Sequence, residues 1–125
     1  MNLVDSSGWL EYFAEGGNAD FFAEPLQDID TVMVPSICCY EVFKVILRQR
    51  SESDALQALA LMHQGITVDI TPEIAVQSAK NSLLYKLPMA DSIIITVARM
   101  FDAVLWTQDV DFKDLAGVRY KPKYP

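Results

Sequence analysis

Residues 31–50 read TVMVPSICCYEVFKVILRQR, and this stretch contains the pattern from which the fold is deduced. Residues 31–34 are apolar or β-branched, which is typical of a short buried strand. Pro35 and Ser36 then favour the start of a helix, which we expect to reach about Arg50. A buried strand followed directly by a long helix is the unit from which parallel sheets are built.

The same alternation of strands and helices continues on both sides of this stretch. The expected strands are residues 3–4, 31–34, 66–70, 103–106 and 118–120. The expected helices are residues 6–15, 19–26, 36–50, 53–64, 72–85 and 88–101. Ser6-Ser7 and Ser51 or Ser53 are expected N-caps, and Thr71-Pro72 is a cap followed by proline at the first helical position. This order predicts an α/β fold, a three-layer α/β/α sandwich with a mainly parallel central sheet, in a single domain spanning residues 1–125.

Composition narrows the class of protein. Hydrophobic residues make up 51% of the chain and charged residues 22%, which is typical of a globular domain. No apolar run approaches the roughly 20 residues of a membrane span, and the N-terminus lacks the pattern of a secretion signal, so we expect a cytoplasmic protein without a membrane partner. The single histidine and two adjacent cysteines exclude histidine-pair nucleases and zinc sites. The net charge of −7 argues against a general nucleic-acid binder.

Five acidic residues follow expected strands or begin expected helices. They are Asp5, Glu41, Asp91, Asp109 and Asp111. In a parallel sheet these positions meet at one edge, where ligands bind beyond the carboxyl ends of the strands. Each residue alone has an ordinary explanation as a turn residue or a helix cap. The coincidence of all five is harder to explain in that way.

Clustered carboxylates repel one another unless a cation holds them together. Mg²⁺ or Mn²⁺ binds oxygen ligands and keeps further positions for water and substrate phosphate. Such a site can activate water to attack phosphorus, which is metal-dependent hydrolysis of a phosphodiester bond. The sequence therefore predicts a metal-dependent phosphodiester hydrolase.

Four stretches of the chain, in this order, resemble motifs of PIN-domain ribonucleases of the VapC type. They are residues 4–13 (VDSSGWLEYF), 40–42 (YEV), 90–98 (ADSIIITVA) and 107–112 (TQDVDF). VapC-type proteins are toxins of bacterial toxin–antitoxin pairs, so the resemblance implies an Mg²⁺-dependent endoribonuclease acting as the toxin of a type II system. It also implies a structured RNA substrate, a cognate antitoxin and a homodimer.

The resemblance assigns roles to individual residues. It implies that Asp5, Glu41, Asp91 and Asp109 are catalytic. Asp5, Asp91 and Asp109 would also bind the metal, together with Asp111. Ser6 and Thr107 would be polar supports beside them. No expected acid is missing, although Ser92 stands where many relatives carry alanine.

The negative net charge, which argues against RNA binding, is partly due to the five acids of the predicted site. Without these five the chain has 12 acids against 10 bases, or −2. Lys44 and Arg48 follow Glu41 by three and seven residues, on the same helical stripe, and are candidates for contacts with RNA phosphates. A solvated face with a Glu41–Lys44 pair is the alternative. Trp9 and Trp106 are expected to fill the core rather than to stack on bases.

Two other classes of protein remain as alternatives. A receiver domain shares the length, the acidity and a late Lys121-Pro122, but it needs an acidic pair after its first strand, where Ser6 follows Asp5. A non-catalytic PIN-like module that binds a partner is the second alternative. The helix expected at residues 53–64 is apolar around more than one face, which favours a two-fold dimer.

Overall fold

The structure of the chain is a computed structural model that describes residues 1–123. Five parallel strands form one sheet in the order β3-β2-β1-β4-β5. The strands are β1 (Asn2–Val4), β2 (Val32–Pro35), β3 (Ile66–Val68), β4 (Val104–Thr107) and β5 (Val118–Tyr120). The helices are α1 (Ser6–Phe13), α2 (Ala19–Leu26), α3 (Ser36–Gln49), α4 (Glu52–Met62), α5 (Pro72–Tyr85) and α6 (Met89–Met100), with 3₁₀ turns η1 (Ile29–Thr31) and η2 (Val110–Phe112).

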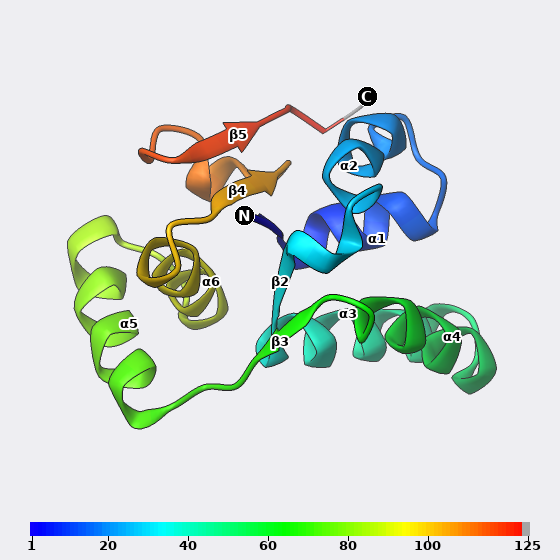
Figure 1. Cartoon of the computed structure of the whole chain (residues 1–125), viewed down its shortest axis with the longest axis horizontal. Coiled ribbons are helices and arrows are strands. Elements are labelled where there is room, and N and C mark those ends of the chain that lie inside the picture. The colour runs from blue at the N-terminus through cyan, green and yellow to red at the C-terminus, as the bar shows by residue number, and fades with distance from the viewer. Residues whose placement is uncertain (124–125) are drawn as a thin grey trace.

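The helices cover the sheet in two layers. Figure 1 shows α5 and α6 on one face and α1 to α4 on the other. The strand order explains this separation, because β1 to β2 and β2 to β3 move in one direction across the sheet and β3 to β4 moves back. Crossovers between parallel strands are right-handed, so a reversed step places its helices on the opposite face. The predicted three-layer sandwich with a parallel sheet is confirmed.

Strands β1 and β4 are parallel neighbours in the middle of the sheet. The strands that follow β1 are added on one side of this pair and the strand that follows β4 on the other, so the order of the strands switches between them. The two strands stay paired to their carboxyl ends, where the Asp5 amide donates to the Trp106 carbonyl at 3.2 Å. In open parallel sheets the crevice beyond such a switch point is the usual ligand site. Asp5 follows β1, and Gln108 and Asp109 follow β4, so the fold delivers these residues to that crevice.

A continuous apolar core lies on both faces of the sheet. Trp9 is fully buried and Trp106 is 4% exposed, which confirms the prediction that both tryptophans belong to the core. Gly8 allows α1 to approach its neighbours closely, since a Cβ there would lie 2.6 Å from the ring of Phe22 and 2.7 Å from the side chain of Val4.

The first helix is capped differently from our prediction. Asp5, and not Ser6 or Ser7, is the N-cap of α1, and its carboxylate accepts the Gly8 amide at 2.8 Å. Asp5 has extended backbone at the end of β1, so its side chain reaches over the first turn, whereas Ser6 and Ser7 are already helical. The caps of α4 and α5 are Ser51 and Thr71, both among the predicted residues.

The apolar surface of α4 is partly covered within the chain. Its Ala55, Ala58 and Met62 are buried, in a helix that packs against α3, and Leu56 is exposed. Part of the apolar surface of α4 is therefore buried without a second subunit. In residues 1–123 there is no helix whose length and apolar character would allow it to span a membrane.

Candidate metal centre

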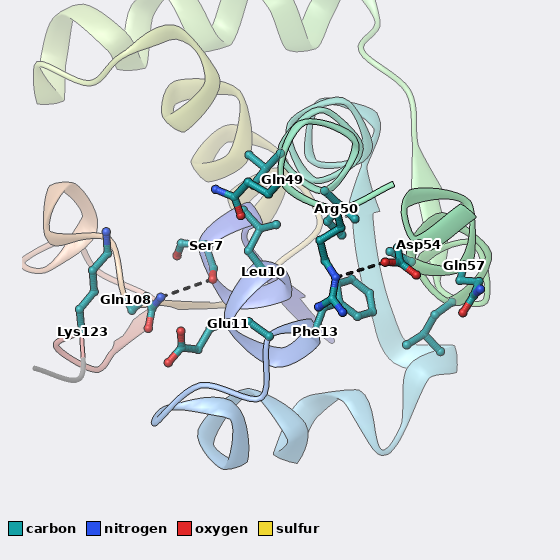
Figure 2. Close-up of a pocket in the computed structure, with 15 residues that line it drawn as sticks. Ser7, Leu10, Glu11, Phe13, Gln49, Arg50, Asp54, Gln57, Gln108 and Lys123 are labelled. Atoms are coloured by element: carbon teal, nitrogen blue, oxygen red, sulfur yellow. Dashed lines mark hydrogen bonds and ion pairs between the residues drawn. The ribbon is translucent and has the colours of Figure 1, made fainter. Parts of the chain in front are cut away.

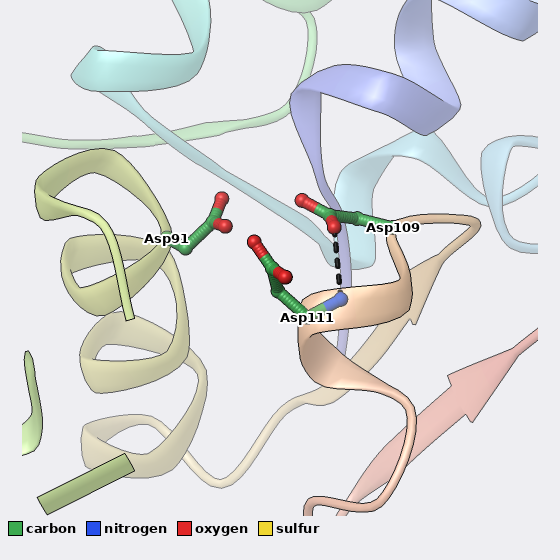
Figure 3. Close-up of side chains that lie close together, drawn as sticks. All are labelled: Asp91, Asp109 and Asp111. Carbon is green, nitrogen blue, oxygen red and sulfur yellow. Dashed lines mark hydrogen bonds between the residues drawn. The ribbon is translucent and has the colours of Figure 1, made fainter. Parts of the chain in front are cut away.

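Three aspartates from two segments converge beyond the switch point. Asp91 comes from the first turn of α6, and Asp109 and Asp111 come from the turn after β4. Each offers a carboxylate oxygen that lies within 4.8 Å of those of the other two. Figure 3 shows the three side chains pointing toward one another across the gap between α6 and η2.

The turn after β4 holds two of these carboxylates in place through its own hydrogen bonds. Asp109 is the N-cap of η2, and its Oδ1 accepts the Asp111 amide at 2.9 Å, the bond drawn in Figure 3. The Asp109 amide donates to Thr107 Oγ1, also at 2.9 Å. Both aspartates therefore project toward α6 from a short segment whose backbone is fixed at each end.

Asp91 is the member of this group whose pKa is raised. Burial, together with the charges of the neighbouring Asp109 and Asp111 carboxyls, raises the pKa of the Asp91 carboxyl to about 8. The Asp91 side chain is half-buried, and its neighbours Ser92 and Ile94 are buried.

Asp5 lies next to this group but is occupied by protein donors. One carboxylate oxygen accepts Ser7 Oγ at 2.7 Å and the Gly8 amide at 2.8 Å, and the other accepts Thr107 Oγ1 at 2.5 Å. Burial raises the pKa of Asp5 to about 6, because the loss of hydration outweighs these hydrogen bonds, and the charge of Asp109 acts in the same direction. Asp5 is not part of the group of three, and Thr107 connects it to Asp109.

Glu41 lies on α3, and its carboxylate is hydrogen-bonded to Ser6 rather than grouped with the three aspartates. Its Oε1 accepts Ser6 Oγ at 2.6 Å, so the first residue of α1 ties this carboxylate to the end of β1. The two predicted polar supports thus lie in the predicted region: Ser6 beside Glu41, and Thr107 between Asp5 and Asp109.

The two predicted RNA-binding residues are exposed on α3. Lys44 donates to Tyr40 Oη at 3.3 Å and lies 5.5 Å from the centre of that ring, so within residues 1–123 it forms no pair with Glu41. Arg48 is exposed near the end of the helix.

Sequence reasoning missed three polar residues beside the site. Ser7 donates to Asp5, and its position two residues after an N-cap aspartate was an available signal. Gln108 is buried between the Asp109 turn and α1, and its Oε1 accepts Asn18 Nδ2 at 3.0 Å. Asn18 lies ninety positions away in the chain, and no local pattern marks it.

The donor set of the three-aspartate group fits a hard divalent cation. Three carboxylates supply only oxygen ligands, which is what Mg²⁺ and Mn²⁺ prefer. Within residues 1–123 the single ion pair is Arg50–Asp54, so no lysine or arginine neutralises the group. The raised pKa of Asp91, caused first by burial and then by the neighbouring Asp109 and Asp111, shows that its negative charge is disfavoured when no cation is bound.

A groove lies on the α1 side of this site, between α1 and the helices α3 and α4 (Figure 2). It has a volume of about 710 Å³. Apolar side chains line much of it: Leu10, Phe13, Val45, Ile46, Ala58 and Leu61. Arg50 and Asp54 form an ion pair at one end, and Ser7, Gln108 and Lys123 lie at the other, beside the Asp109 turn.

Comparison with known proteins identifies the fold and the family. Residues 3–118 match the family model described as the PIN domain. No curated protein sequence matches the chain. A toxin–antitoxin complex from Klebsiella pneumoniae is similar in structure, with 22% identity, a TM-score of 0.80 and coverage of 95% of this chain and 96% of that one.

Two further solved structures have the same fold. VapC20 of Mycobacterium tuberculosis, described as a toxin that cleaves the sarcin–ricin loop, has 15% identity, a TM-score of 0.79 and coverage of 93% and 95%. VapBC2 of Rickettsia felis, bound to a DNA fragment from its promoter, has 12% identity, a TM-score of 0.75 and coverage of 97% of each chain. At these identities the likeness establishes the fold alone.

Proposed function

Since the chain belongs to the PIN domain family, we propose that it is a divalent-metal-dependent endoribonuclease, the toxin of a type II toxin–antitoxin system. The observation that carries this proposal is the convergence of Asp91, Asp109 and Asp111 beyond the switch point of the sheet without a basic partner in residues 1–123. VapC20, which has this fold, is described as a toxin that cleaves the sarcin–ricin loop, and this supports the choice of RNA as substrate.

In this proposal the three aspartates hold Mg²⁺ or Mn²⁺. A divalent ion bound there supplies activation of water and stabilisation of charge on the phosphate oxygens. Glu41 is proposed to accept a proton from the attacking water, and Asp5, whose two oxygens already accept protein donors, is proposed to hold Thr107 and the start of α1 in place beside the group. Thr107 orients Asp5 and fixes the Asp109 backbone, and Ser6 orients Glu41.

RNA cleavage with and without metal tests the proposal. Purified protein should hydrolyse members of a panel of structured RNAs in Mg²⁺ or Mn²⁺ and should lose this activity in excess EDTA. Equal cleavage in EDTA would show that the mechanism is wrong. Binding of a partner without cleavage of any RNA would favour the alternative function, a non-catalytic PIN-like module.

The groove between α1 and α3–α4 is the surface that we propose for a cognate antitoxin. Its apolar floor suits the apolar face of a helix, a common mode of peptide recognition. Its far end reaches Gln108, the neighbour of Asp109, so a peptide in the groove could extend an arginine or lysine to the carboxylates. Similar folds occur in solved toxin–antitoxin complexes, which supports a partner of this kind.

A pair of substitutions on one helix tests the antitoxin surface. Leu61 lines the groove and Leu56 is exposed on the same helix outside it. Leu61→Glu should weaken binding of the product of the neighbouring gene by at least about tenfold, because a charge would replace apolar contact, and Leu56→Glu should not. Calorimetry measures both. Equal effects of the two substitutions, or inhibition of cleavage that does not weaken as Mg²⁺ is raised, would contradict this binding mode.

The homodimer remains a proposal, but the structure suggests a different surface for it. Exposed apolar side chains gather on α5 and at the start of α6 rather than on α4: Val76, Leu83, Leu84 and Met89. A patch of this kind is typical of a subunit interface. Light scattering at micromolar concentration tests the proposal, and a monomer would contradict it.

A further inference from the structure

The positive charge of this acidic protein is concentrated at one end of the chain. Residues 113–123 contain four bases and one acid, a net charge of +3, whereas the other residues carry six bases and sixteen acids, or −10. Three of these bases alternate in sequence: Arg119, Lys121 and Lys123. We refer to these three residues as the basic strip.

The chain is extended along the basic strip and is held in place on both sides. β5 contains Arg119, and beyond it the Lys121 amide continues the pairing with β4 by donating to the Thr107 carbonyl at 3.0 Å. The Pro122 carbonyl accepts Asn18 Nδ2 at 2.8 Å. Alternate residues of an extended chain point to the same side and lie roughly 7 Å apart. The strip is therefore a row of cations on a fixed backbone, and Figure 1 shows this segment running from β5 toward α2.

Aromatic rings restrain the side chains of Arg119 and Lys121, the first two cations of the basic strip. The Arg119 guanidinium lies 4.8 Å from the centre of the Trp106 ring, and Lys121 Nζ lies 5.7 Å from that of Phe21. The two rings are themselves 5.0 Å apart, so both cations stand over one aromatic surface. Packing of this kind restrains the long side chains while their hydrogen-bond donors stay directed to solvent.

No carboxylate neutralises the basic strip within the described part of the chain, where the single ion pair is Arg50–Asp54. The strip also leads to the carboxylate site. Lys121 is bonded through its amide to Thr107, whose hydroxyl contacts Asp5 and Asp109, and Lys123 lines the groove beside Gln108. A row of free cations beside a phosphodiester-cleaving centre suits a polyanion that must enter that centre.

We propose that the basic strip binds consecutive phosphates of a single-stranded RNA segment next to the bond that is cut. The inference rests on the proposed ribonuclease function and adds the surface that holds the substrate. Three cations at a regular spacing contact backbone phosphates and not bases, so the strip provides affinity that depends on salt and not on sequence. It also explains how a protein with a net charge of −7 can bind RNA.

Binding without cleavage tests this proposal. In an Asp109→Asn/Asp111→Asn background two of the three proposed metal ligands and two negative charges are removed, so RNA should be bound and not cut. Adding Lys121→Gln and Lys123→Gln should weaken binding of a labelled single-stranded RNA by about tenfold at low salt. The slope of log affinity against log salt should fall by about 1.4, or 0.7 for each lost phosphate contact. Fluorescence anisotropy across a NaCl series measures both quantities.

The matched control removes two lysines from α5 and its end. Lys80→Gln and Lys86→Asn change the net charge equally, and asparagine tolerates the positive φ of Lys86. This control should keep the affinity and the salt slope. If the strip variant also keeps both, or if it loses affinity only for an acidic protein partner, the proposal is wrong. If the background protein binds RNA through the strip but the intact protein cleaves no RNA with any divalent metal, the proposed function is wrong and the RNA surface stands.

Discussion

Asp109→Asn and Asp91→Asn should each reduce metal-dependent RNA cleavage by at least about a hundredfold. Each substitution removes one of the three carboxylates that lie within 4.8 Å of one another. Loss of a metal ligand costs several kcal/mol of charge stabilisation, and each 1.4 kcal/mol is a factor of ten in rate. Single-turnover cleavage of the best RNA of the panel measures the effect, and circular dichroism checks that each variant is folded.

Asp114→Asn is the matched control for these variants. Asp114 is exposed and lies three residues after Asp111 in the same turn region, outside the group of three. This variant loses the same charge and should cleave RNA at a rate close to that of the wild type. Wild-type activity in Asp109→Asn would show that the three-aspartate group is not the catalytic centre.

Asp91→Asn should stabilise the metal-free protein, and more at high pH. The folded-state pKa of Asp91 is raised from 3.8 to about 8, so between these values the folded protein binds more protons than the unfolded chain. The free energy of unfolding of the wild type therefore falls as pH rises from about 4 to about 8 and then levels off. Asparagine does not titrate and lacks this loss, so in EDTA the melting temperature of the variant should exceed that of the wild type by several degrees at about pH 8 and by much less at about pH 5.

Metal should reduce the difference between these melting temperatures. An ion that binds only the folded wild type adds about 2.7 kcal/mol at a hundredfold excess over Kd, and the variant should gain less. Asp69→Asn, at an exposed aspartate outside the cluster, is the control and should show neither effect. A variant that is clearly less stable than the wild type in EDTA would mean that Asp91 has a structural role as a helix-terminal residue.

The architecture was accessible from sequence because its signals are local. Apolar runs marked the strands, and Ser51, Thr71 and Pro72 marked helix starts. Element ends were less accurate: β3 ends at Val68 rather than at Ile70, and β4 extends to Thr107. Tertiary pairing decides these ends, since strand residues are defined by their partners across the sheet.

The sequence predicted the region of the candidate site, but it did not predict which side chains contact one another there. The carboxyl-edge rule placed the five acids together, yet three of them form one group while Asp5 and Glu41 bind neighbouring hydroxyls. The bond between Asn18 and Gln108 joins residues far apart in the chain, so neither position predicts the other. The location of the exposed apolar surface also needed the packed structure, because α4 packs against α3 and buries Ala55, Ala58 and Met62.

The central claim is that Asp91, Asp109 and Asp111 hold the divalent ion on which RNA cleavage depends. Anomalous diffraction from crystals of the wild-type protein in Mn²⁺ tests it most directly, because the signal locates the ion without assumptions about the reaction. We predict an anomalous peak among these three carboxylates that disappears in Asp109→Asn crystals. Strong cleavage in Mn²⁺ together with ordered Mn²⁺ elsewhere and none at the three aspartates would contradict the claim.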